Sequence, residues 1–156
     1  MRNTGRTGAL ALAAAMAFTV AASAQPSSAV EFVVLAWGTD SGVRTPTQVV
    51  IRDAGAWRAL WTRHAGAQGI PPAVDFDREM VIAIFAGIQP MATRLAISRI
   101  VREPDRLVVY YMLREMRPLP QPEEVPTARP FVMVRVARSP LRVDFVVLRT
   151  PPIVGP

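Results

Sequence analysis

Seven short runs of β-branched, aromatic and aliphatic residues constrain the fold of this 156-residue chain more than any other feature. Most are separated by a few residues that include Gly, Pro or Asp, the pattern of successive β-strands and turns. The exception is a long proline-rich connection before the last two runs. We expect strands at residues 29–37, 47–52, 80–86, 95–101, 107–113, 131–138 and 141–148.

The segment between the second and third runs has a helical period instead. Its aromatic and aliphatic side chains recur at i, i+3, i+4 and i+7, namely Trp57, Leu60, Trp61 and His64. Asp53 stands where an N-cap is expected, and Gly66 stands where the helix would end. One amphipathic helix over about residues 54–65 is therefore predicted. The fold class is α+β: a mainly antiparallel β-sheet, curled or barrel-like, with this helix packed on it.

The first 24 residues have the pattern of a secretory signal peptide. Arg2 and Arg6 precede an apolar stretch at residues 8–22 that is too short to cross a bilayer, and Ala22-Ser23-Ala24 resembles a cleavage site. A retained membrane anchor is disfavoured because no stop-transfer segment follows. We expect cleavage after Ala24, a single secreted or periplasmic domain at residues 25–156, and no membrane span in that domain.

Cysteine is absent from the chain. This excludes disulfides, thiolate metal ligands and a bacterial lipoprotein anchor. A secreted domain of this size must then be stabilised by packing alone, and the apolar fraction of 51% supports a sizeable core.

Basic residues outnumber acidic ones by 18 to 12, and every one of them is Arg. Removal of Arg2 and Arg6 with the signal peptide would lower the net charge from +6 to about +4. Nucleic-acid binders usually cluster their cations in a stripe, whereas these arginines alternate with acidic and apolar residues. No nucleic-acid partner is expected, and the sequence does not decide whether the folded domain has a local basic patch.

The last two runs are predicted to form a hairpin with its tip at Ser139-Pro140. One face would then be apolar, with the cross-strand pairs Val136–Val143, Val134–Phe145 and Val132–Val147. The other face would pair Arg135 with Asp144 and is otherwise half apolar. That face needs cover from the helix or from another molecule, and we favour the helix.

Residues capable of chemistry are few. His64 is the only histidine. Two interpretations are open: it is a catalytic residue, or it is a structural residue that lies near the last carbonyl groups of the helix. Asp75, Asp77 and Glu79 alternate like the opening of a calcium loop, but the sixth position is Met80 where an EF-hand needs Gly. We therefore expect no catalytic residue, no metal site and no cofactor.

Two connections are candidates for binding a protein partner. The strand run at 80–86 stops at Gly87, and residues 87–94 lead into the next run. Residues 118–130 hold five prolines, which favour an extended backbone suited to recognition by a partner. Each segment is alternatively only a turn or a stiff connection. The candidate partner-binding residues are Gln89, Pro90, Met91, Arg94, Pro120 and Pro122.

The strings VVIRDAGAWRALWTRHAG (49–66) and PPAVDFDREMVIAIFAG (71–87) resemble the C-terminal domain of PrcB, an accessory subunit of a bacterial surface protease complex. The resemblance covers about residues 47–147, and its structural signature is Trp57, Leu60, Trp61, Asp75, Phe76 and Gly87. Thr127-x-x-Pro130 resembles a later element of the family. Members of the family commonly continue with Arg-Pro-Thr-Gly-Gly-Tyr after the strand, whereas here the chain reads Gln-Pro-Met-Ala-Thr-Arg at 89–94.

The resemblance implies a non-enzymatic, protein-binding domain that associates with and stabilises a secreted protease. It names no catalytic residue. Three alternatives remain: a protease inhibitor that presents the proline-rich loop, a small-ligand-binding domain, and a secreted hydrolase that uses His64 with Asp75 or Glu79.

Overall fold

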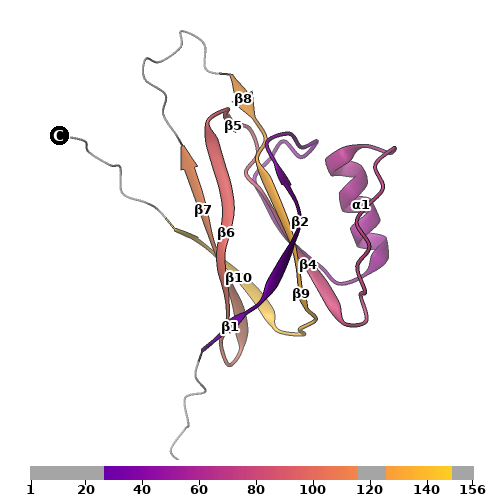
Figure 1. Ribbon diagram of the computed structural model, residues 1–156, viewed down its shortest axis with the longest axis vertical. Helices are drawn as coiled ribbons and strands as arrows, with labels where there is room; N and C mark the ends of the chain where they lie inside the picture. The colour runs from indigo at the N-terminus through magenta and orange to yellow at the C-terminus, as the bar shows by residue number, and fades with distance from the viewer. Residues whose placement is uncertain (1–26, 116–125, 149–156) are drawn as a thin grey trace, which may run out of the picture.

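A computed structural model describes residues 27–115 and 126–148, which form two four-stranded sheets and a helix stacked in three layers (Figure 1). The outer sheet has the order β1 (Ser28–Val30), β6 (Thr93–Arg102), β7 (Arg106–Glu115) and β10 (Arg142–Leu148). The central sheet has the order β2 (Phe32–Gly38), β9 (Phe131–Ala137), β4 (Glu79–Phe85) and β3 (Thr47–Ile51). The helix α1 (Ala54–Ala65) covers the far side of the central sheet, and a small sheet joins β5 (Gln89–Pro90) to β8 (Thr127–Ala128). The expected signal peptide lies outside the described residues.

The predicted helix is confirmed, together with both of its caps. The Asp53 carboxylate accepts a hydrogen bond of 2.8 Å from the Ala56 N–H, and the Gly66 N–H donates to the Thr62 carbonyl at 2.9 Å. Gly66 has a φ of 81°, which glycine adopts without steric cost. Trp57 and Leu60 are buried against the central sheet, as the helical period predicts.

Strand β4 is buried on both faces because it lies in the middle layer. Met80, Ile82 and Ile84 point towards the outer sheet, and Val81, Ala83 and Phe85 point towards α1. All six are at most 2% exposed. This explains why the sequence of β4 is continuously apolar and shows no alternation.

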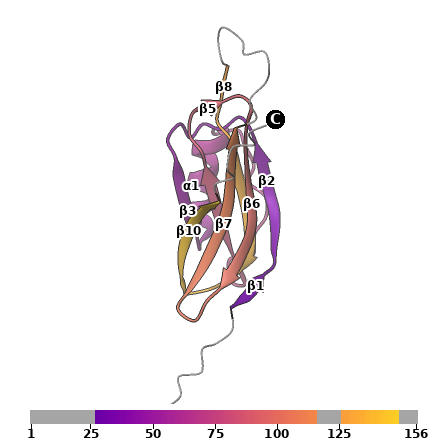
Figure 2. The same ribbon diagram turned by 90° about the vertical axis from the view of Figure 1, so that its left-hand side faces the viewer.

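The α+β class and the mainly antiparallel pairing are confirmed, but the expected barrel is wrong. The strands form separate sheets, and neither four-stranded sheet closes on itself or curls strongly (Figure 2). The predicted strand at 29–37 is interrupted at Glu31, so that β1 pairs with β6 in the outer sheet and β2 pairs with β9 in the central sheet. The short strands β5 and β8 were not predicted.

The predicted hairpin at 131–148 is also wrong. Strand β9 pairs with β2 and β4, whereas β10 pairs with β7 in parallel. The connection at Ser139-Pro140 crosses from one sheet to the other, and the Arg52 guanidinium donates to the Ser139 carbonyl at 3.2 Å. The physical reason is that β2 and β4 occupy both edges of β9, so β10 has no free edge there and pairs with β7 in the outer sheet.

Much of the predicted apolar face nevertheless forms one core. Val132, Val134 and Val136 pack with Val143 and Phe145 across the space between the sheets instead of along a strand ladder. Val147, predicted to lie in the same face, is 39% exposed. The opposite face of β9 contacts α1 through Phe131 and Met133, which confirms that the helix provides the expected cover.

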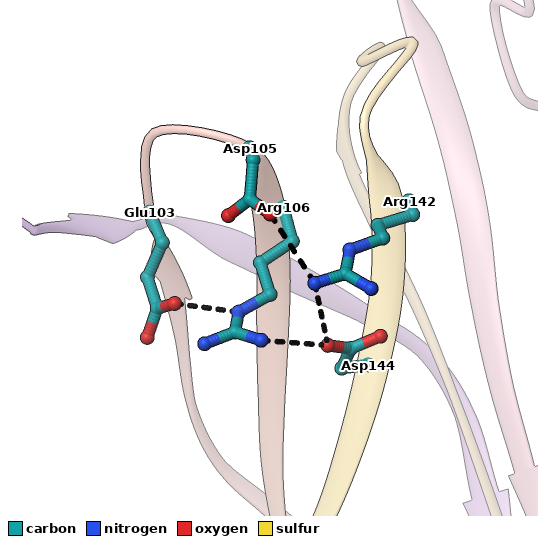
Figure 3. Close-up of polar contacts among 5 residues, drawn as sticks. All are labelled: Glu103, Asp105, Arg106, Arg142 and Asp144. Carbon is teal, nitrogen blue, oxygen red and sulfur yellow. Dashed lines mark hydrogen bonds and ion pairs between the residues drawn. The ribbon is translucent and has the colours of Figure 1, made fainter.

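The predicted pair of Arg135 with Asp144 is replaced by two separate sets of ion pairs. Arg135 lies 3.4 Å from Glu79, while Asp144 accepts from Arg106 at 3.3 Å. Arg106 also binds Glu103 at 2.5 Å, and Arg142 lies 3.2 Å from Asp105 and 3.8 Å from Asp144 (Figure 3). The hydrogen bond that Arg106 donates to the Glu103 carboxylate raises the pKa of Arg106. This cluster joins the β6–β7 turn to β10 and so fixes the parallel register.

Candidate binding surface

The pairing of β5 with β8 brings parts of the two candidate binding segments together. Gln89 lies opposite Ala128 and Pro90 lies opposite Thr127, and the Met91 N–H donates to the Pro126 carbonyl at 2.7 Å. We call residues 87–94 and 126–130 the β5–β8 junction. Pro120 and Pro122, the other predicted binding residues, lie outside the described residues.

Gly87 fixes the start of the junction against the loop that precedes β3. It has a φ of 71°, and a Cβ atom there would lie 2.8 Å from Pro46 Cδ and 2.9 Å from the Arg44 carbonyl oxygen. The neighbouring Ile88 N–H donates to that same carbonyl at 3.2 Å. The break after β4 is therefore a turn with a close backbone approach, a geometry that requires glycine.

The predicted residues of the junction differ in what they present to solvent. Met91 is 56% exposed, its neighbour Ile88 is 53% exposed, and Arg94 is also exposed. Gln89 and Pro90 are half-buried, and the Gln89 amide donates to the Ala86 carbonyl at 2.8 Å. Met91 and Arg94 therefore offer side chains for contact, whereas Gln89 and Pro90 shape the backbone that carries them.

Arg94 lies directly opposite Arg114 in the β6–β7 ladder. Both are exposed, and the next pair, Leu95 with Leu113, turns inward to line a pocket between the sheets. Within residues 27–115 and 126–148 neither guanidinium forms an ion pair. Like charges in directly opposed positions destabilise a sheet. Arg114 was missed from the sequence because only the strand register places it beside Arg94.

The pocket beside the junction has a volume of about 340 Å³. The ten described residues that line it are uncharged: Pro46, Thr47, Gln48, Ile84, Phe85, Ala86, Gln89, Leu95, Tyr111 and Leu113. Across it, the Gln48 amide donates a 2.7 Å hydrogen bond to the Tyr111 hydroxyl. Sequence reasoning missed this pocket because its walls come from five different strands and the residues next to them.

His64 is held by structural contacts. Its Nδ1 lies 2.9 Å from the Ser41 hydroxyl, and its ring centroid lies 4.1 Å from that of Phe131. Burial lowers the pKa of His64, and the negative charge of Asp40 opposes this shift. Ser41 is only 2% exposed, so this Ser–His contact offers no opening for a substrate. Nothing in the sequence pointed to Ser41 as the partner.

The acidic residues considered with His64 have other partners. Asp75 lies 4.0 Å from Arg78 and accepts from the Asp77 N–H at 3.1 Å, which closes a tight turn before β4. Glu79 pairs with Arg135. In the described part of the chain no group of three or more His, Cys, Asp or Glu side chains has a geometry that suits a metal ion.

The remaining signature residues have structural positions. Trp57 is buried and its indole N–H donates to the Pro72 carbonyl at 3.0 Å. Trp61 packs edge-on against Trp57, and Leu60 and Phe76 belong to the core under the helix. These residues hold α1 and the loop after it on the central sheet.

Comparison of the chain with family models, with curated proteins and with solved structures found no match. The resemblance to the PrcB C-terminal domain therefore stays a prediction. Among the described residues, no helix has the length and apolar character needed to cross a membrane.

Proposed function

We propose that this chain is a non-enzymatic, secreted protein-binding module whose contact surface is the β5–β8 junction. One observation carries the proposal: the β5–β8 pairing fixes the backbone at Met91, the β6–β7 ladder fixes Arg94 opposite Arg114, and all three side chains are exposed. Methionine and arginine are enriched in protein interfaces. A preformed backbone lowers the conformational entropy lost on binding.

The surface defines the chemistry of its partner. Ile88 and Met91 offer apolar side chains, and the Arg94–Arg114 pair offers two positive charges in opposed positions. A partner carboxylate placed between the guanidiniums would form charge-assisted hydrogen bonds with both and relieve their repulsion. The partner surface is therefore apolar with at least one acidic residue beside the apolar part.

The resemblance to the PrcB C-terminal domain supports a secreted protease as this partner. Binding to the folded protease, and not to its unfolded chain, would stabilise the protease by mass action. In this proposal, the protease carries the apolar surface with the acidic residue, and that surface lies outside its substrate cleft.

Capture of partners from the extracytoplasmic fraction of the source cells tests the proposal. The double variant Met91→Ala/Arg94→Ala should weaken the captured complex without lowering the melting temperature, because both side chains are exposed. Ile70→Ala/Arg58→Ala is the matched control, since it removes an exposed apolar side chain and an exposed Arg from α1 and the loop after it. A complex unchanged in the first variant, or weakened equally in the control, contradicts the proposed surface.

A further inference from the structure

Strand β3 is an edge of the central sheet with the uncharged pocket beside it. It is the last strand in the order β2-β9-β4-β3 and lies at one margin of the molecule (Figure 2). Within residues 27–115 and 126–148 its backbone pairs only with β4. The outer edge of β3 therefore presents unpaired N–H and C=O groups along five residues.

We propose that β3 binds an extended segment of the protein partner by strand addition, with one apolar side chain of that segment inserted into the pocket. This inference rests on the proposed protein-binding function and specifies that the bound part of the partner is an extended strand. Main-chain hydrogen bonds to a sheet edge supply affinity in such complexes, and a pocket for an alternate side chain supplies specificity.

The side chains of β3 direct the added strand towards the pocket. Gln48 and Val50 point into the space between the two sheets, where Gln48 reaches Tyr111 and Val50 packs on the core. Successive side chains of a neighbouring strand alternate in the same way. A residue placed opposite Gln48 therefore has its side chain over the pocket of about 340 Å³, which is within the range of ligand pockets.

The charges around β3 select the side chains of the segment. The pocket lining is uncharged, so an apolar or aromatic side chain enters without loss of ion hydration. Residues 41–52 contain Arg44 and Arg52 and no acidic residue. Arg52 already donates to the Ser139 and Leu141 carbonyls, whereas Arg44 is exposed at the start of β3. The positive charge of Arg44 therefore favours an acidic residue at the end of the added strand that lies near it.

The rim of the pocket is already in place before binding. Pro46 contacts Gly87 at the close approach described above, and the Arg44 carbonyl accepts from the Ile88 N–H. The Tyr111 hydroxyl accepts from Gln48, which leaves its own hydrogen available as a donor towards a bound peptide carbonyl. A preformed site of this kind loses little entropy when the segment is ordered.

A peptide probe on isotopically labelled whole chain tests the inference by NMR titration. The probe is acetyl-Thr-Val-Thr-Phe-Thr-Asp-amide, which in the antiparallel direction places Phe opposite Gln48 and Asp near Arg44. We expect amide shifts at residues 47–51 and 84–86. A second peptide with Asp in place of Phe tests the pocket, and a third that is N-methylated at alternate amides tests the strand ladder. Each change should weaken binding by about tenfold or more.

Two variants of the protein complete the test. Gln48→Trp places an indole in the pocket and should weaken binding of the first peptide by a similar factor. Arg58→Ala is the control and should leave the affinity for that peptide unchanged. If the N-methylated peptide binds as tightly as the first peptide, strand addition is overturned, and the site is a pocket for a side chain or small molecule without a strand ladder. Absence of binding by the first peptide would also overturn the inference. If Met91→Ala/Arg94→Ala still weakens the captured complex in that case, the proposed function stands and only the mode of binding at β3 is wrong.

Discussion

Strand β4 offers the strongest test of the three-layer arrangement. Ile82 is fully buried between the two sheets, and Val81 is fully buried between the central sheet and α1. Ile82→Ala should lower the free energy of unfolding by about 2–5 kcal/mol, the usual cost of that truncation in a core. Val81→Ala deletes two methyl groups, at about 0.8 kcal/mol each plus the cost of the cavity, and should lower it by about 1.5–3 kcal/mol.

Urea denaturation measures both effects as shifts of the midpoint at constant slope. The control is Val33→Ala on β2, where the same truncation is made at a side chain that is 52% exposed. Its expected cost is below about 1 kcal/mol, since only part of the apolar area is lost from burial. If either β4 substitution costs no more than the control, the corresponding face of β4 is uncovered and the layer assigned to it is wrong.

Two further predictions concern charge. Because burial lowers the pKa of His64 below 6.5, the unfolded state takes up a proton first as the pH falls. The free energy of unfolding should therefore decrease as the pH falls below about 7.5 and should level off below the folded-state pKa of His64. Urea denaturation measured over this pH range, above the pH at which carboxylates titrate, should show no such decrease for His64→Gln. Arg114→Glu places opposite charges across the β6–β7 ladder at Arg94 and should raise the free energy of unfolding by about 0.2–1 kcal/mol while weakening the captured complex. A loss of both stability and binding on Arg114→Glu would contradict the assignment of the arginine pair to recognition.

The parts of the fold that sequence predicted correctly are those determined by local patterns. The α1 boundaries follow from Asp53, Gly66 and the helical spacing of buried side chains, all within 14 residues of sequence. The strand positions follow from runs bounded by turn residues. What local patterns lack is the identity of each strand's neighbour, because a turn such as Ser139-Pro140 serves equally as a hairpin tip or as a crossing between sheets.

The sequence did contain one sign of the correct topology. Both faces of β9 are apolar, and a strand of that kind belongs in a layer covered on each side. The predicted hairpin would have placed Val146 under the helix beside Met133, whereas Val146 lies in the outer sheet and is 38% exposed. The apolar face was therefore predicted correctly except at Val147, while β10 was paired with the wrong strand.

The surface that we propose for binding could be outlined from the sequence only where one continuous segment forms it. Met91 and Arg94 belong to the segment that was singled out, and both are exposed. Arg114 and the pocket depend on strand register and on contacts between sheets, and neither leaves a pattern at short range in the sequence.

The residues that stabilise the turn at Gly87 differ from those that we propose for recognition. Gly87 is fixed against Pro46, and the Ala86 N–H donates to the Pro130 carbonyl at 2.9 Å, so the frame depends on buried backbone. Arg94 and Arg114 lie outside that frame, directly opposite each other in the β6–β7 ladder, where like charges are unfavourable. An anion placed between the two guanidiniums would relieve this repulsion. Relative to the PrcB C-terminal pattern that the sequence resembles, residues 89–94 carry different side chains at this surface, while the glycine at the turn, Gly87, is the same.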